Sequence, residues 1–125
     1  MNTYKYHKLT RKIIKGYYEV YNELGKGFLE SVYERAMQIV LENDLELDVS
    51  TQQAIQVQFR DRVVGHYQAD LLIENKVIVE LKAVSKLLPE HKAQLINYLK
   101  ATNIELGLLM NFGDKPEFKR FIFDK

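Results

Sequence analysis

The stretch Val77-Ile78-Val79-Glu80-Leu81-Lys82-Ala83-Val84 decides the fold of this chain. Apolar residues fall on both faces of an extended segment here, so we expect a central β-strand that is covered on both sides. Glu80 and Lys82 nevertheless stand inside this strand, two residues apart and therefore on one face. Burying unpaired charge in such a strand is costly, so these two residues need partners.

The preceding segment, residues 63–73, predicts the neighbouring strand. The tight link Glu74-Asn75-Lys76 joins the two segments, which predicts an antiparallel hairpin. Matching the apolar faces of the two strands sets the parity of their register, which puts Asp70 on the same face as Glu80 and Lys82. With a link of three residues, Asp70 then pairs directly with Glu80. The hydrophobic pattern alone therefore gathers two carboxylates and the ammonium of Lys82 on one face of the sheet.

Two carboxylates this close repel each other strongly unless a cation lies between them. Mg²⁺ is the natural occupant because it takes oxygen ligands, and Mn²⁺ is the alternative. Lys82 beside the metal can orient or deprotonate a water, or stabilise developing charge, as in a hydrolytic phosphodiester site. A structural interpretation stays open, in which Lys82 forms a buried ion pair and Asp70 lies near water at the end of the sheet.

Helices and further strands surround this hairpin in the predicted fold. Helical spacing of apolar residues, alternation in strands and the two prolines place them. The predicted helices are 8–24, 28–43 and 89–101, and the predicted strands are 54–60, 63–73, 76–84, 104–112 and, at the sheet edge, 118–123. We therefore expect one α/β domain over residues 1–125, with a mixed sheet flanked by helices in the order α-α-β-β-β-α-β.

The composition bounds the class of protein. The 125 residues suffice for one core, and 18 Lys and Arg against 17 Asp and Glu give a net charge of +1. This balance argues against a polycation but allows a local nucleic-acid-binding patch. The absence of cysteine excludes a disulfide scaffold, a thiolate zinc site and a cysteine nucleophile. No apolar run reaches the ~18 residues of a membrane span, and we expect a cytoplasmic protein without membrane contact.

The pattern Asp70 followed by Glu80-Leu81-Lys82, on two adjacent strands and before a helix, resembles the PD-(D/E)XK nuclease superfamily. More specifically, the chain resembles the small bacterial and archaeal proteins called the GxxExxY family. The naming motif stands here as Gly27-Phe28-Leu29-Glu30-Ser31-Val32-Tyr33. Further stretches that resemble this family are 65–70, 79–83, 94–99 and 111–113, so that the resemblance runs from about Ile13 to Arg120.

This resemblance implies a restriction-endonuclease-like core and a nuclease that hydrolyses phosphodiester bonds of nucleic acid, with DNA as the expected substrate. It implies that Asp70 and Glu80 bind a divalent metal and that Lys82 assists the attacking water. Ala69 stands where the superfamily name has a proline, which is a common variation.

The resemblance also implies accessory residues. Glu30 becomes a further ligand or orienting group, although an acid at a helix start is also explained by the helix dipole. Glu34, one turn later, is expected to be solvated. Gln94 and Tyr98 match the Gln-x-x-x-Tyr element of the branch that resembles RecB and lambda exonuclease, and a core position is the alternative for Tyr98.

A second hypothesis assumes the same fold without phosphodiester hydrolysis. In it, the chain is a non-catalytic module that binds nucleic acid or protein and acts with a partner or as a homodimer. The near-neutral charge suits such a component. This module would bind in a manner indifferent to Mg²⁺ and to Lys82, whereas the nuclease requires both. The sequence leaves DNA against RNA, and endonuclease against exonuclease action, open.

Overall fold

The structure, a computed structural model, describes residues 6–124. Two helices come first, α1 (His7–Leu24) and α2 (Glu30–Ile39), and a wider helical turn, η1 (Val40–Asp44), continues α2. The remaining elements are β1 (Val49–Phe59), β2 (Arg62–Ile73), β3 (Val77–Lys82), α3 (Pro89–Ala101), β4 (Leu106–Phe112) and β5 (Pro116–Ile122). The predicted order of elements is confirmed, and the predicted edge strand is β5.

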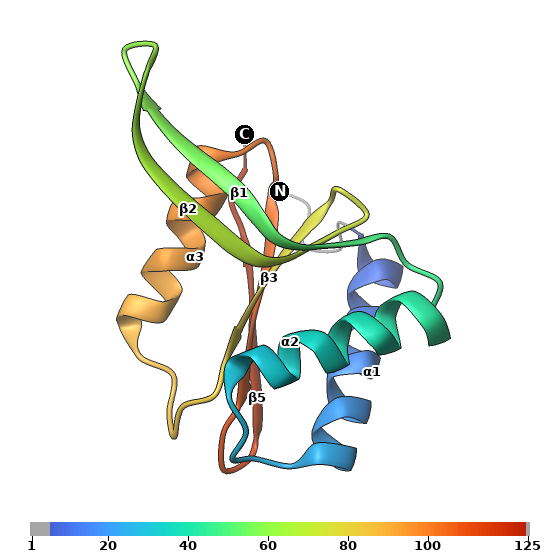
Figure 1. Cartoon of the computed structure of the whole chain (residues 1–125). Helices are drawn as coiled ribbons and strands as arrows, with labels where there is room; N and C mark the ends of the chain where they lie inside the picture. The colour runs from blue at the N-terminus through green and yellow to red at the C-terminus, as the bar shows by residue number, and fades with distance from the viewer. Residues whose placement is uncertain (1–5, 125) are drawn as a thin grey trace.

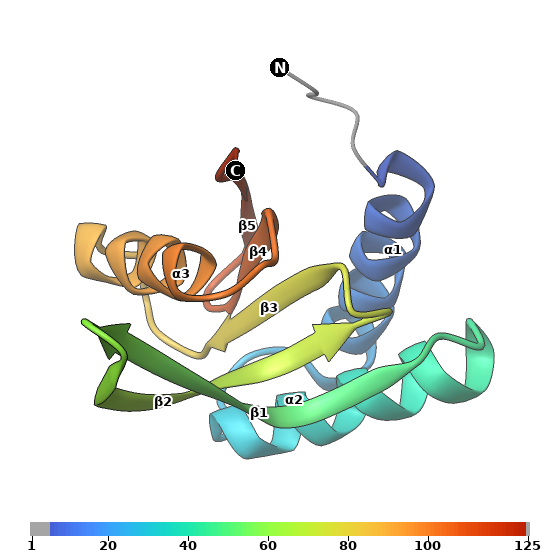
Figure 2. The same cartoon turned by 90° about the horizontal axis from the view of Figure 1, so that it is seen from above.

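The five strands form one mixed sheet in the order β1-β2-β3-β4-β5. Strands β3 and β4 pair in parallel through the crossover helix α3, and the other neighbouring pairs are antiparallel. Helices α1 and α2 cover one face of the sheet, and α3 covers the other (Figures 1 and 2). Strand β3 therefore lies in the centre with helices on both sides, as its apolar sequence predicts.

The hairpin of β2 and β3 has the predicted register. Leu71 pairs with Val79 and Ile73 with Val77, so the apolar faces of the two strands coincide. The backbone of Glu74 and Asn75 is left-handed, with φ of 55° and 54°, which closes the tight turn between the strands.

Strand β1 begins at Val49, and the prediction that it begins at Ala54 is wrong. Val49 pairs with Ile73, and the polar residues 50–53 lie along the outer edge of the sheet beside β2. An edge position needs no alternation of apolar residues, so the sequence pattern does not reveal this part of the strand. Gln52 interrupts the regular strand with a left-handed φ of 48°.

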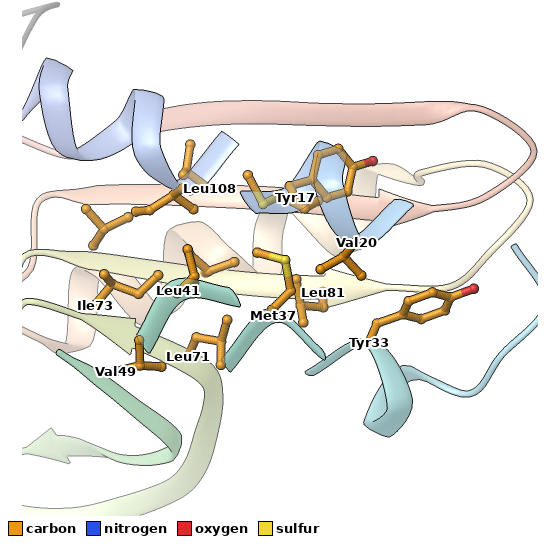
Figure 3. Close-up of a cluster of buried hydrophobic side chains, with 14 of the residues drawn as sticks. Tyr17, Val20, Tyr33, Met37, Leu41, Val49, Leu71, Ile73, Leu81 and Leu108 are labelled. Carbon is orange, nitrogen blue, oxygen red and sulfur yellow. The ribbon is translucent and has the colours of Figure 1, made fainter. Parts of the chain in front are cut away.

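The main hydrophobic core lies between the sheet and the helices α1 and α2 (Figure 3). Every one of these elements contributes to it, as seen in Tyr17, Met37, Leu41, Leu71, Leu81 and Leu108. A smaller cluster fills the space under α3 and contains Ile55, Ala69, Ile78, Leu95, Tyr98, Leu99 and Leu109.

Helical spacing over residues 28–43 predicts an apolar stripe of Leu29, Val32, Tyr33, Ala36 and Val40, and the buried face of α2 differs from it. The stripe expected from spacing begins with Leu29 and Val32, but these side chains are 76% and 38% exposed. Helix α2 begins at Glu30 rather than at Phe28, so Leu29 precedes the helix. Tyr33, together with Met37 and Leu41, forms the buried face instead.

Two glycines position α3 and the segment that leads into it. A Cβ at Gly107 would lie 2.9 Å from Leu95, so the glycine lets α3 pack directly on β4. A Cβ at Gly113 would lie 2.5 Å from the carbonyl oxygen of Val84. The buried side chain of Asn111 also holds Val84, accepting from its N–H at 3.0 Å and donating to its carbonyl at 2.9 Å. The chain thus leaves β3 on a defined path toward α3.

Within residues 6–124, no helix combines the length and the apolar character needed to cross a membrane.

Candidate active site

A pair of carboxyl groups lies where the backbone pairing of β2 and β3 ends. This pairing extends as far as Leu71 and Val79. At the next residue of each strand, a side-chain carboxyl accepts a hydrogen bond from the backbone of the other strand. The N–H of Asp70 donates to Oε2 of Glu80 at 3.1 Å, and the N–H of Leu81 donates to Oδ2 of Asp70 at 2.8 Å. The predicted juxtaposition of Asp70 and Glu80 is therefore present, and each carboxyl is bound to the strand opposite its own.

Glu80 is almost wholly removed from water, whereas Asp70 is half-buried, and the burial of Glu80 controls its protonation. Glu80 is 3% exposed. Burial is the main cause, and a hydrogen bond to Asp70 and the negative charge of Asp70 add to it, so that the pKa of Glu80 rises from 4.5 to about 9. The N–H of Asp70 and the charge of Lys82 offset this only in part. Without a cation, Glu80 therefore holds a proton at neutral pH.

This donor set suits a hard cation. Both residues present carboxyl oxygens, which are the ligands that Mg²⁺ prefers, and a divalent charge would favour the ionised form of Glu80. Within residues 6–124, no cluster of three or more His, Cys, Asp or Glu side chains could hold a metal ion. The protein would thus supply two carboxyl groups, and Mg²⁺ commonly completes its shell with water and substrate phosphate oxygens.

Lys82 lies next on the same face of β3, toward helix α3. Its Nζ donates to Oε1 of Gln94 at 3.2 Å. One turn further along α3, Tyr98 is 4% exposed and hydrogen-bonds to Gln94. Burial, followed by the negative charges of Glu80 and Asp70, raises the pKa of Tyr98 to about 12. The structure therefore brings together all the predicted site residues of β2, β3 and α3.

Helix α2 also reaches this centre, through Glu34 and not through Glu30. The Nε2 atom of Gln52 donates to Oε1 of Glu34 and lies 3.5 Å from Oδ1 of Asp70. Burial and the charge of Asp70 raise the pKa of Glu34, while the bond from Gln52 opposes this. The prediction that Glu34 is solvated holds only in part, because its side chain is half-buried and bonded to Gln52. Glu30 is exposed on the first turn of α2, and its side chain makes no hydrogen bond or ion pair with the described residues.

The sequence does not identify Glu34 and Gln52 as residues of the site. Glu30 and Glu34 are one turn apart and share a helix face, so spacing alone does not tell which of them reaches the sheet. Gln52 lies in a polar segment without strand periodicity. The one feature of the sequence that could identify Glu34 is its position directly after Tyr33, the first buried residue of α2.

Comparisons with known proteins agree with this architecture. A family model described as the PD-(D/E)XK nuclease superfamily matches residues 7–121. The comparison with curated proteins finds no match.

Two solved structures resemble the chain. The crystal structure of SSO0001 has a TM-score of 0.60 and 19% sequence identity, and the match covers 76% of this chain and 51% of that one. An alkaline exonuclease (LHK-Exo) from Laribacter hongkongensis has a TM-score of 0.54 and 15% identity, with 75% and 55% covered. The matched region is about half the length of either structure, and at these identities the likeness shows the fold.

Proposed function

The chain belongs to the PD-(D/E)XK nuclease superfamily, and on this premise we propose that it is a Mg²⁺-dependent nuclease that hydrolyses the phosphodiester bonds of DNA. The observation that carries the proposal is the pairing of Asp70 with Glu80, next to a lysine that a glutamine of α3 holds in place. The fold shared with an alkaline exonuclease supports it. The finer resemblance to the GxxExxY proteins stays a prediction.

Asp70 and Glu80 are the residues that would hold the metal, with Mn²⁺ as the alternative to Mg²⁺. A divalent ion held there supplies positive charge that polarises the scissile phosphate. Because backbone N–H groups orient both carboxyls, the two groups are already positioned to bind a cation. Glu80 must give up its proton for this, and the released proton passes to solvent.

Lys82 acts on the reacting groups in this proposal. Its ammonium orients the attacking water and stabilises the negative charge that develops on the phosphate. The water oxygen bonds to phosphorus, the bond from phosphorus to the leaving oxygen breaks, and the proton of the water passes to solvent. Gln94 orients Lys82 through the bond to Nζ, and Tyr98 in turn bonds to Gln94. Glu34 and Gln52 orient Asp70 from the other side, and this geometry favours Glu34 over Glu30 as the orienting acid of α2.

The test is cleavage of end-labelled single-stranded DNA, duplex DNA and RNA with Mg²⁺, with Mn²⁺ and in EDTA. We expect turnover that EDTA abolishes. Lys82→Met should slow cleavage at least ~100-fold, since losing one donor that stabilises developing charge costs ~10²–10³-fold. The control is Lys86→Met, which removes an exposed lysine outside the site. Equal rates for the two folded variants would show that the mechanism assigned to Lys82 is wrong.

A second candidate function is the non-catalytic binding module. The observation that favours it is an apolar surface at the start of α2, where Phe28, Leu29 and Val32 are 48%, 76% and 38% exposed. Such a surface is typical of sites that bind another protein. This function predicts no cleavage of any strand and binding that is unchanged by EDTA and by Lys82→Met.

A further inference from the structure

A groove of about 760 Å³ runs between the β1–β2 hairpin and helix α3. The hairpin and the helix lie side by side in both views of the fold (Figures 1 and 2). This volume falls within the ~300–1,000 Å³ that is usual for small-molecule sites. The lining residues are Gln56, Val57, Gln58 and Tyr67 of the hairpin and Glu90, Ala93, Gln94, Asn97, Tyr98, Lys100 and Ala101 of α3.

The groove adjoins the carboxyl pair. Gln94 lines the groove and also accepts the hydrogen bond of Lys82 at 3.2 Å. Tyr98 lines the groove as well, and the charges of Glu80 and Asp70 act on its hydroxyl. A ligand in the groove would therefore contact Gln94, which is bonded directly to Lys82 beside the carboxyl pair.

The walls of the groove are neutral and amide-rich. Four lining residues carry carboxamides, and the charges of Glu90 and Lys100 balance each other. Tyr67 is 51% exposed, and its ring centroid lies 5.8 Å from that of Tyr98, with the planes tilted by 47°. Such walls carry no excess of positive charge and therefore do not favour a phosphate over a neutral group. They suit a flat, uncharged group whose rim carries hydrogen-bond donors and acceptors.

We propose that this groove binds an unpaired nucleobase of the substrate strand, stacked on Tyr67, next to the nucleotide whose phosphate lies at Asp70 and Glu80. Aromatic rings stack on any base, and carboxamides are the side chains that match base edges. A base inside a duplex is stacked and paired, so it can enter only after it has been freed. The proposal rests on the proposed nuclease function and narrows its substrate to single strands or frayed ends.

The test measures binding without hydrolysis. A short single-stranded DNA that carries one 2-aminopurine is titrated with the full chain in EDTA, where no metal supports cleavage. We expect saturable quenching of the 2-aminopurine and weaker binding to the paired duplex of the same sequence. Stacking on an aromatic side chain contributes ~1–3 kcal/mol per base, so Tyr67→Ala should weaken binding at least about fivefold and relieve the quenching. Tyr67→Phe keeps the ring and should bind like the wild type.

Phe59→Ala is the matched control, because Phe59 is 59% exposed on the same hairpin but does not line the groove. Melting temperatures establish that each variant is folded. Binding by Tyr67→Ala equal to that of the wild type, equal affinity for the paired duplex, or no binding at all would overturn the proposal.

This test is separable from that of the nuclease function. Cleavage that persists while Tyr67→Ala has no effect on binding removes the groove proposal alone. Binding that depends on Tyr67, in a protein that never cleaves with Mg²⁺, removes the hydrolytic function alone.

Discussion

Asp70 and Glu80 are each held by the strand opposite their own: Glu80 accepts from the N–H of Asp70 at 3.1 Å, and Asp70 accepts from the N–H of Leu81 at 2.8 Å. Two acids that would repel each other in their ionised forms are therefore fixed in contact by the fold itself. Their geometry does not depend on a bound ion, and the consequences of this can be measured in the metal-free protein.

The first prediction concerns stability against pH. The pKa of Glu80 is about 9 in the folded protein, above the ordinary value of 4.5 to which it returns on unfolding. Between these values the folded chain binds more protons than the unfolded chain, so the free energy of unfolding falls as pH rises from about 5 to 9. Glu34, whose pKa is also raised, acts in the same direction, whereas Tyr98 titrates near 12, outside this range.

Urea unfolding in EDTA across this pH range is the measurement. Glu80→Gln keeps an acceptor for the N–H of Asp70 but does not titrate, so it should remove at least ~1 kcal/mol of the decline. Glu90→Gln, an exposed acid on α3, is the control and should follow the wild type. A wild-type protein whose stability does not fall with pH would contradict the raised pKa.

The second prediction links metal binding to proton release. Because Glu80 is protonated at neutral pH, Mg²⁺ or Mn²⁺ must displace that proton, and the apparent affinity should rise with pH up to about 9. Calorimetric titration at pH 7 in two buffers of different ionisation enthalpy should give different heats, corresponding to about one released proton. The Asp70→Ala, Glu80→Ala double variant should show no saturable binding. Identical heats in the two buffers would exclude the coupling.

The third prediction separates the role of Gln94 from simple packing. Gln94→Leu fills a similar volume but gives Lys82 no acceptor, so kcat should fall about tenfold, the loss expected for a misplaced reacting group. Gln94→Glu restores an acceptor oxygen and should recover most of the loss. Steady-state kinetics with melting temperatures as the control decide this, and equal activities for the two variants would show that the bond to Lys82 is unimportant.

The fourth prediction distinguishes the two acids of α2. Glu34→Gln should lower the cleavage rate at least tenfold, because Glu34 is connected to Asp70 through Gln52. Glu30→Gln should change the rate less than twofold, because Glu30 is exposed on the first turn of the helix. Rates are compared at saturating Mg²⁺. The reverse order would favour the assignment that the sequence motif suggests.

The sequence predicts the parts of the site that depend on residues close together along the chain. Asp70 meets Glu80 because a tight hairpin joins their strands, so matching apolar faces fixes the parity of the register. Helix α3 begins at Pro89 as predicted, and its spacing puts Gln94 and Tyr98 on one face. Each of these relationships spans few residues, and each is encoded by periodicity.

The parts that the sequence does not predict depend on contacts between distant segments. The choice between Glu30 and Glu34 depends on which turn of α2 lies beside Gln52 of β1, and helical phase does not encode this. The first half of β1 is polar and is held in place by pairing with β2. The neighbouring rings of Tyr67 and Tyr98 belong to a hairpin and a helix that meet only in the tertiary structure.

Gln52 carries a further consequence for engineering and evolution. A left-handed backbone at a residue other than glycine costs on the order of 1 kcal/mol, and Gln52 holds it at the point where its amide reaches both Glu34 and Asp70. Glycine at this position would relieve the strain and leave the two acids without their common donor. Selection for thermal tolerance and selection for activity therefore favour different residues at this single position.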